Sequence, residues 1–169
     1  MKKSIFLLGF MGSGKTSLGK ELAHYLNYPF YDLDSEIENA TGLKVKEIFH
    51  SEGEEAFRMY EAEQLRKFNS TKEPFVLACG GGTPCFHHNM DWMNQNGWTL
   101  FLDVPERILA QRLEGQQEER PLLAGLKGIS SSKTWRHLLE KRRPIYLQAA
   151  SRLASEDINL NEVIHMLNS

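Results

Sequence analysis

Cysteine is scarce in this sequence of 169 residues, which contains only Cys79 and Cys85. Two thiols cannot by themselves supply the ligands of a structural zinc site. They also give no sign of the disulfide framework that holds many small secreted domains together. We therefore interpret Cys79 as a small residue of a strand and Cys85 as a loop residue.

Long hydrophobic runs and an excess of charge are missing as well. No apolar stretch approaches the roughly 20 residues that a membrane-spanning helix needs. The start, Lys2 and Lys3 followed by Ile5–Leu8, resembles a secretory signal, but the apolar run is too short and no cleavage site follows. The net charge of −2 predicts no polyanion-binding surface. We expect a monomeric, cytoplasmic protein without a membrane or nucleic-acid partner.

What remains is an alternation of apolar runs and helical periodicity, which predicts an α/β fold with a parallel sheet. Without a repeat or a linker, residues 1–169 are expected to form a single domain. Gly42 and Gly53 are expected to interrupt the helices. The expected strands cover residues 4–9, 29–33, 75–79, 98–104 and 151–154, and the expected helices cover residues 15–28, 35–40, 44–69, 87–96, a stretch from 105, 132–150 and a stretch from 160.

Residues 114–131 form a polar segment that is long for a loop in a compact domain. Such segments often act as lids over an active site, and a disordered surface loop is the alternative. Arg120 lies within this segment, followed by Pro121, Leu122 and Leu123. An arginine on a lid that reaches transferred phosphate is a recurrent device in phosphoryl transfer.

The segment Gly9–Thr16 satisfies the phosphate-binding pattern G-x-x-x-x-G-K-[ST]. It lies between an apolar strand and an amphipathic helix, as the mechanism requires, because loop N–H groups and the helix N-terminus together bind phosphate. Lys15 is expected to neutralise phosphate charge and the Thr16 hydroxyl to bind Mg²⁺. The predicted ATP-binding residues of this loop are Gly12, Ser13, Gly14, Lys15, Thr16 and Ser17.

Asp32 and Asp34 end the second expected strand, where residues two apart point to the same face. Ligands gather at the carboxyl ends of parallel strands, beside the phosphate loop. One carboxylate is expected to hold the Mg²⁺ shell and the other to orient or deprotonate an acceptor hydroxyl. Alternatively, one of them caps the helix that starts near Ser35 and the other is solvated.

Gly80, Gly81 and Gly82 end the third expected strand on the same edge. Consecutive glycines suggest that an acceptor substrate approaches the main chain closely, although a plain tight turn is the alternative. Arg58 and Arg142 come from separate helices, and their planar forks suit a carboxylate. Glu54 and Glu61 share the side of the helix that carries Arg58, so they are expected to fix its guanidinium in the pocket, and a solvated salt-bridge face is the alternative.

In family order, these pieces resemble the shikimate kinase family from end to end. They are the phosphate loop, Phe30 to Asp34, Gly53 and Glu54 with Phe57, Arg58 and Glu61, the three glycines, Arg120 to Leu123, and Arg142 with Pro144 and Tyr146. The resemblance implies the nucleoside-monophosphate-kinase type of α/β fold, a three-layer sandwich with a five-stranded parallel sheet of order 2-3-1-4-5 and a mobile lid.

The resemblance also implies a reaction in which ATP phosphorylates shikimate to shikimate 3-phosphate, on the path to aromatic amino acids, with Mg²⁺ as cofactor. Arg143 stands beside Arg142, so an exchange of roles between the two stays open. The implied roles are phosphate binding and catalysis by Lys15 and Arg120, Mg²⁺ binding by Thr16 and Asp32, activation of the hydroxyl by Asp34, acceptor binding by Arg58, Gly80, Gly81, Gly82 and Arg142, and adenine stacking by Arg112.

Two classes of rival function remain. The first is another small-metabolite kinase, such as a gluconate or nucleotide kinase, but a nucleotide acceptor would need base-recognition groups. The second is a non-catalytic nucleotide-binding protein, which could lose Lys15, Asp34 or Arg120, yet all three are present. A GTPase switch is disfavoured because the sequence lacks an N-K-x-D segment.

Overall fold

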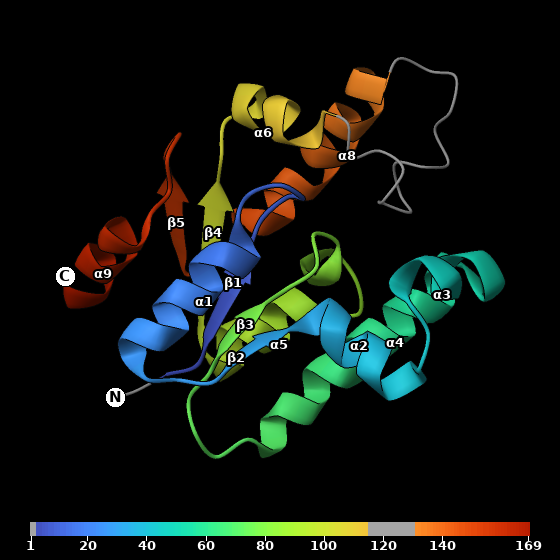
Figure 1. The fold of residues 1–169 in the computed structure, drawn as a ribbon, viewed down its shortest axis with the longest axis horizontal. Coiled ribbons are helices and arrows are strands. Elements are labelled where there is room, and N and C mark those ends of the chain that lie inside the picture. Colours follow the sequence, from blue (N-terminus) through green and yellow to red (C-terminus); the bar gives the residue numbers. More distant parts are fainter. Residues whose placement is uncertain (1–2, 115–130) are drawn as a thin grey trace.

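The computed structural model describes residues 3–114 and 131–169, and in the second range the side chains from Trp135 onward. Its centre is a five-stranded parallel sheet of order β2-β3-β1-β4-β5, which confirms the expected order (Figure 1). Each strand enters the sheet close to its predicted position. The strands are β1 (Ile5–Leu8), β2 (Phe30–Asp32), β3 (Val76–Ala78), β4 (Trp98–Asp103) and β5 (Ser151–Ala154).

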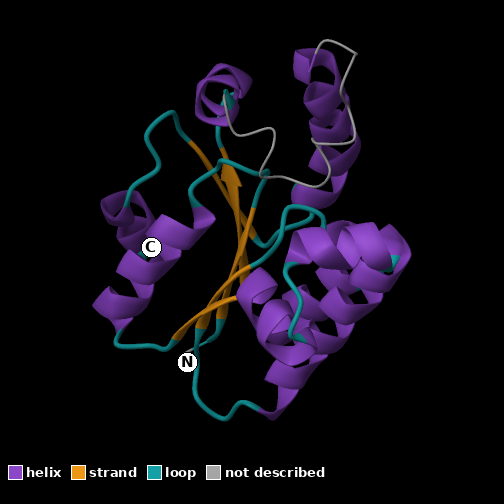
Figure 2. Ribbon diagram, turned by 45° about the vertical axis from the view of Figure 1, so that its right-hand side comes forward, coloured by secondary structure: helices purple, strands orange, loops and turns teal. Residues whose placement is uncertain are grey.

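Helices cover both faces of the sheet, which is seen nearly edge-on in Figure 2. Alternate residues of β1 point to opposite faces. Ile5 and Leu7 pack in a cluster with α1 and α9, whereas Phe6 and Leu8 pack in a second cluster with α2, α3, α4 and α5. The helices named here are α1 (Lys15–Leu26), α2 (Leu33–Thr41), α3 (Val45–Ser51), α4 (Gly53–Lys67), α5 (Asn89–Asn96) and α9 (Leu160–Asn168).

A third apolar cluster lies beyond the carboxyl edge of the sheet, where α6 (Glu106–Leu113) and α8 (Ser131–Tyr146) meet. It joins Phe10 of the phosphate loop to Phe101 of β4 and to Trp135 and Leu139 of α8. Short 3-10 turns follow α4 and β3, at Phe68–Ser70 and Thr83–Cys85. The third apolar cluster holds α8 over the same edge of the sheet that carries the phosphate loop.

Several predicted helix boundaries were wrong by a few residues. Helix α1 ends at Leu26 because Asn27 adopts a left-handed conformation with φ of 54°. Helix α5 starts at Asn89, because His87 and His88 are left-handed as well. The chain leaves α8 after Tyr146, before the predicted end at residue 150.

The predicted lid falls outside the described residues, apart from its two ends. Glu114 follows α6, and Ser131 opens α8. Arg120 is outside the described part of the chain as well. No described helix is both long and apolar enough to cross a lipid bilayer.

Candidate active site

The phosphate loop Gly9–Thr16 connects β1 to α1 at the carboxyl edge of the sheet. Gly9, Gly12 and Gly14 have φ values of +151°, +82° and +90°, a region that side-chain-bearing residues rarely adopt. Gly14 also precedes α1 without offering a side-chain cap to its first N–H groups. An uncapped helix N-terminus after a glycine loop is the backbone arrangement that binds phosphate.

Two cations from different elements lie against this loop. The Lys15 ammonium donates hydrogen bonds to the carbonyl oxygens of Gly9 (2.8 Å) and Phe10 (3.0 Å). From α6, Arg112 Nη1 donates to the Gly12 carbonyl oxygen at 2.9 Å. Both side chains are therefore within reach of a polyphosphate bound to the loop.

Thr16 and Asp32 meet beside the loop. The Thr16 hydroxyl donates a 2.9 Å hydrogen bond to Asp32 Oδ2. Mg²⁺ takes hard oxygen ligands, usually one or two from protein with phosphate oxygens and waters supplying the rest. No group of three acidic, histidine or cysteine side chains suited to a metal occurs among the described residues. A hydroxyl and a carboxylate in contact thus fit a cation that is held largely by the nucleotide.

The prediction that Asp34 lies on the second strand was wrong. Asp32 ends β2 and is the N-cap of α2, and its Oδ1 accepts from the backbone N–H groups of Asp34 (3.1 Å) and Ser35 (3.4 Å). This cap draws Asp34 into the first turn of the helix. The capping alternative therefore holds for Asp32, together with its contact at the phosphate loop.

The Asp34 carboxyl is enclosed on one side. Its Oδ1 is buried and has no hydrogen-bond partner among the described residues. Burial raises the pKa of Asp34 to about 7, and the charges of Glu61 and Asp32 add to the rise while Lys15 and Arg58 oppose it. A carboxylate with a pKa near neutral is suited to accept a proton from a hydroxyl group.

Arg58 is held in place from three sides. Its guanidinium donates to Glu61 Oε1 at 3.0 Å and to Glu54 Oε1 at 3.1 and 3.3 Å, and it lies 4.4 Å from the ring centroid of Phe86. Glu61 is fully buried, and its Oε2 accepts from the Thr83 hydroxyl at 2.6 Å. Arg58 is itself buried, so the solvated salt-bridge alternative does not apply to it.

The three glycines form a floor on which these side chains rest. A Cβ at Gly80 would lie 2.9 Å from Glu61 Oε2 and 3.3 Å from Asp34 Oδ1. One at Gly82 would lie 2.5 Å from the Arg58 guanidinium. A side chain would therefore displace the charged groups, which explains why this segment consists of glycine.

Arg142 and Arg143 are separated by the fold. Arg142 of α8 is buried at the glycine floor, 3.1 Å from where a Cβ of Gly81 would stand, and its Nη1 has no hydrogen-bond partner in the described part of the chain. Arg143 points away and forms two hydrogen bonds with Asp103. Arg142 is thus the arginine of this pair that reaches the site.

These groups line two adjoining cavities that share Met11, Asp34, Gly80 and Gly81. The first has a volume of about 480 Å³, and its other lining residues are Glu38, Lys44, Val45, Lys46, Phe49, Phe57, Arg58, Glu61, Gly82 and Arg142. The second has a volume of about 760 Å³, and its other lining residues are Gly12, Ser13, Gly14, Lys15, Thr16, Ser17, Leu18, Glu21, Asp32, Cys79, Arg112, Asp157, Ile158 and Asn159. We call them the acceptor cavity and the nucleotide cavity.

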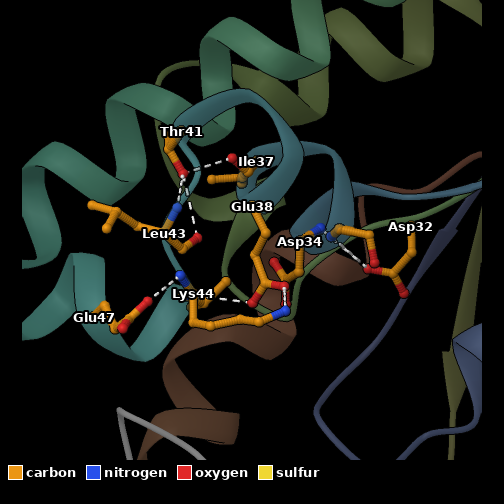
Figure 3. A network of polar contacts seen from close by, with 10 residues as sticks. Asp32, Asp34, Ile37, Glu38, Thr41, Leu43, Lys44 and Glu47 are labelled. Carbon is orange, nitrogen blue, oxygen red and sulfur yellow. Dashed lines mark hydrogen bonds and ion pairs between the residues drawn. The ribbon is translucent and has the colours of Figure 1, made fainter.

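The segment that joins α2 to α3 lines part of the acceptor cavity. Figure 3 shows the polar contacts of this segment. Glu38 accepts from the Lys44 ammonium at 2.8 Å and from the Val45 N–H at 3.1 Å. The Lys44 N–H in turn donates to Glu47, which completes the cap of α3. In Figure 3 the side chains of Asp34 and Glu38 lie on the same side of α2, so this turn is fixed to the helix that carries Asp34.

The helical spacing already joined Glu54 and Glu61 to Arg58, and the fold adds the burial of Glu61 and its bond to Thr83. Sequence reasoning did not select some other residues that line the site. Lys44 and Lys46 carried no signal, because they come to the cavity through the α2–α3 turn. Asp157 begins the C-terminal segment that lines the nucleotide cavity, and no motif marked it.

Known proteins are similar to this chain along most of its length. The shikimate kinase family model matches residues 11–167. A shikimate kinase of Bacteroides fragilis is 45% identical over 145 residues, which cover 86% of this chain and 80% of that protein. One of Parabacteroides distasonis is 39% identical over 167 residues, which cover 99% and 96%.

Solved structures agree with the sequence comparisons. The shikimate kinase of Bacteroides thetaiotaomicron has a TM-score of 0.87 at 36% identity, with 99% of both chains covered. The shikimate kinase of Acinetobacter baumannii, solved in complex with shikimate, has a TM-score of 0.86 at 32% identity, with 98% of this chain and 90% of that chain covered. The chain belongs to the shikimate kinase family.

Proposed function

We propose that this chain transfers the γ-phosphoryl group of ATP to the 3-hydroxyl of shikimate, giving shikimate 3-phosphate and ADP for aromatic amino-acid biosynthesis. The observation that carries the proposal is a pair of buried polar atoms without partners among the described residues, Asp34 Oδ1 and Arg142 Nη1. Both residues line the acceptor cavity. A small acid that carries a hydroxyl and a carboxylate would satisfy both atoms at once.

The acceptor is held by charge and shape. Arg142 forms no ion pair in the described part of the chain, so its positive charge is available to the substrate carboxylate. Arg58 already pairs with Glu54 and Glu61, which fix its guanidinium before a substrate arrives. A prearranged donor loses little entropy on binding. The glycine floor leaves room for Glu61, Arg142 and Arg58 to lie against the backbone of the cavity.

Phosphoryl transfer takes place where the two cavities join. Asp34 lines both of them, which supports a role in orienting the acceptor hydroxyl and taking its proton. Lys15 is the residue of the loop that neutralises phosphate charge as it builds up, and Arg112 lies over the nucleotide side of the loop. Thr16 and Asp32 would hold Mg²⁺, which supplies charge neutralisation on the phosphates when bound. Arg120 is proposed to add a positive charge from the segment outside the described residues.

The test is release of ADP with ATP and Mg²⁺, measured with shikimate, with gluconate, with nucleoside monophosphates and without an acceptor. We expect turnover that depends on shikimate. In Asp34→Asn the turnover rate should fall by about a hundredfold or more, while ATP binding persists. Arg142→Ala should raise the KM for shikimate more than the KM for ATP. Turnover with another acceptor alone would leave a kinase but refute this substrate, and near-normal turnover by Asp34→Asn would refute the role of that residue.

We propose that the chain works as one domain, as a monomer, and in the cytoplasm. Sedimentation of the purified protein over a range of concentrations tests the second of these, and fractionation of cells tests the third. A stable dimer across that range would refute the monomer.

A further inference from the structure

Asp103, at the carboxyl end of β4, is a buried carboxylate shared by two arginines. Arg143 of α8 donates from Nη1 to Oδ1 at 2.5 Å and from Nη2 to Oδ2 at 2.7 Å. Arg152 of β5 donates from Nε to Oδ2 at 2.6 Å. Neither arginine lines the acceptor or the nucleotide cavity, so the proposed mechanism does not use this cluster directly.

The ion pair of Asp103 with Arg143 affects the acceptor cavity because Arg143 is next to Arg142 in α8. Consecutive residues of an α-helix point about 100° apart around the axis. The two hydrogen bonds from Arg143 to Asp103 therefore fix the rotation of α8, and with it the direction in which Arg142 leaves the helix. Four residues beyond Arg142, the Tyr146 hydroxyl donates to the Gly81 carbonyl oxygen. Helix α8 is thus held at two polar points, one in the sheet and one in the glycine floor.

The other contacts of α8 fix its rotation less closely. Arg136 pairs with Glu106 of α6 at 3.5 Å, but both of these side chains are about half exposed. Trp135, Leu139 and Tyr146 pack against Phe10 and Phe101 in the third apolar cluster. Apolar packing stabilises the helix on the sheet but is non-directional. A bidentate arginine–carboxylate pair fixes both orientation and distance.

We propose that Asp103 is a positioning residue for the acceptor substrate: through Arg143 it sets the rotation of α8 and so directs the Arg142 guanidinium into the acceptor cavity. The inference rests on the proposed function for the identity of the acceptor. It does not require Asp103 or Arg143 to touch that acceptor.

Arg152 supplies a matched control. It bonds the same carboxylate and its side chain is 48% exposed, compared with 39% for Arg143, but it comes from β5 and not from α8. Truncating either arginine removes a cation of similar exposure from Asp103. Only the loss of Arg143 releases the helix that carries Arg142.

The experiment compares Asp103→Asn, Arg143→Ala and Arg152→Ala with the unaltered chain, by kcat, by the KM for shikimate and for ATP, and by melting temperature. We expect Asp103→Asn and Arg143→Ala to raise the KM for shikimate about tenfold, well within the cost of misplacing a substrate-binding group. The KM for ATP and all constants of Arg152→Ala should stay within about twofold of the unaltered values. If Asp103→Asn does not fold, Arg143→Ala alone carries the comparison.

A purely structural role would lower the melting temperature and leave the two KM values unchanged, or raise both alike, and would overturn the proposal. An equal effect of Arg152→Ala would overturn it too. In an Arg142→Ala background, Arg143→Ala should have almost no further effect on the KM for shikimate, because its influence acts through Arg142. Independent, multiplying effects contradict the proposal.

A crystal structure of Arg143→Ala separates this inference from the proposed function. If the Arg142 guanidinium keeps its place at Gly81, the inference is refuted whatever the acceptor is. If it moves while the unaltered chain does not use shikimate, only the proposed function fails.

Discussion

The Thr16 hydroxyl donates a 2.9 Å hydrogen bond to Asp32 Oδ2, which joins the start of α1 to the N-cap of α2. The other oxygen of the same carboxylate, Oδ1, accepts from the first N–H groups of α2. One side chain therefore stabilises a helix with one oxygen and faces the nucleotide cavity with the other. Substitutions can separate these two contributions.

We expect Asp32→Asn to keep the free energy of unfolding nearly unchanged, because asparagine is as good an N-cap as aspartate. Asp32→Ala should lower it by about 0.5–2 kcal/mol, the usual cost of losing a cap. Both variants should need more Mg²⁺ for half-maximal turnover, because both lose the charge. Denaturant unfolding and a Mg²⁺ titration of turnover measure the two effects, and an unaltered Mg²⁺ requirement in Asp32→Asn would argue against a role in metal binding.

The raised pKa of Asp34 predicts a dependence of stability on pH. The ordinary value is 3.8 and the folded value is about 7, so between them the folded chain binds more protons than the unfolded chain. The favourable contribution of the protonated carboxyl is complete below the ordinary value and is lost as the pH rises through 7. Asp34→Asn should therefore be more stable than the unaltered chain by roughly 1–3 kcal/mol at about pH 8.

Denaturant unfolding without metal or nucleotide measures this difference across the pH range. The advantage of Asp34→Asn should shrink steadily toward about pH 4, where both side chains are neutral. A constant difference at all pH values would show that Asp34 ionises normally in the folded chain.

Gly82→Ala should raise the KM for shikimate, because the new Cβ would lie 2.5 Å from the Arg58 guanidinium and push it from its place. The backbone of Gly82 has φ of −92°, which alanine tolerates, so the effect would come from the contact alone. Gly42→Ala is the control: its φ of +73° strains alanine, but no atom lies within 4 Å of the added Cβ. That variant should lose about 1 kcal/mol of stability and keep its KM. Unchanged KM values in Gly82→Ala would contradict the floor role.

Asn89→Ala should destabilise the protein by roughly 1–3 kcal/mol, since it leaves buried polar groups unpaired. Asn89 is fully buried, donates to the Thr83 carbonyl oxygen at 2.9 Å and accepts from Arg66 at 2.7 Å. Asn96→Ala, an exposed change on the same helix, should alter stability by less than about 0.5 kcal/mol. Thermal or denaturant unfolding measures the change in stability of both variants. Equal changes would mean that the buried network contributes little.

Much of the framework could be predicted from local patterns. The apolar run at Ile5–Leu8 marks a strand, because the buried run and its flanking breaks are properties of the chain itself. The phosphate loop is readable for the same reason, since its glycines and Lys15 are contiguous. The strand order came from the family resemblance and not from these patterns.

The prediction for Asp34 gave the correct edge of the sheet but the wrong secondary structure. Strand alternation put it beside Asp32, but a cap had already started the helix. The residue still reaches the site, because a strand's carboxyl end and the N-terminus of the following helix lie at the same edge of the sheet.

Local patterns in the chain were enough to predict the strands, most helices, the phosphate loop and the types of side chain that phosphoryl transfer needs. The packing of distant segments determines which of two adjacent arginines faces the acceptor cavity, and it buries Glu61 between Arg58 and Thr83. Arg142 and Arg143 have the same side chain and nearly the same local context. Their difference arises because Asp103, distant in sequence, binds one of them and thereby turns the other toward the glycine floor.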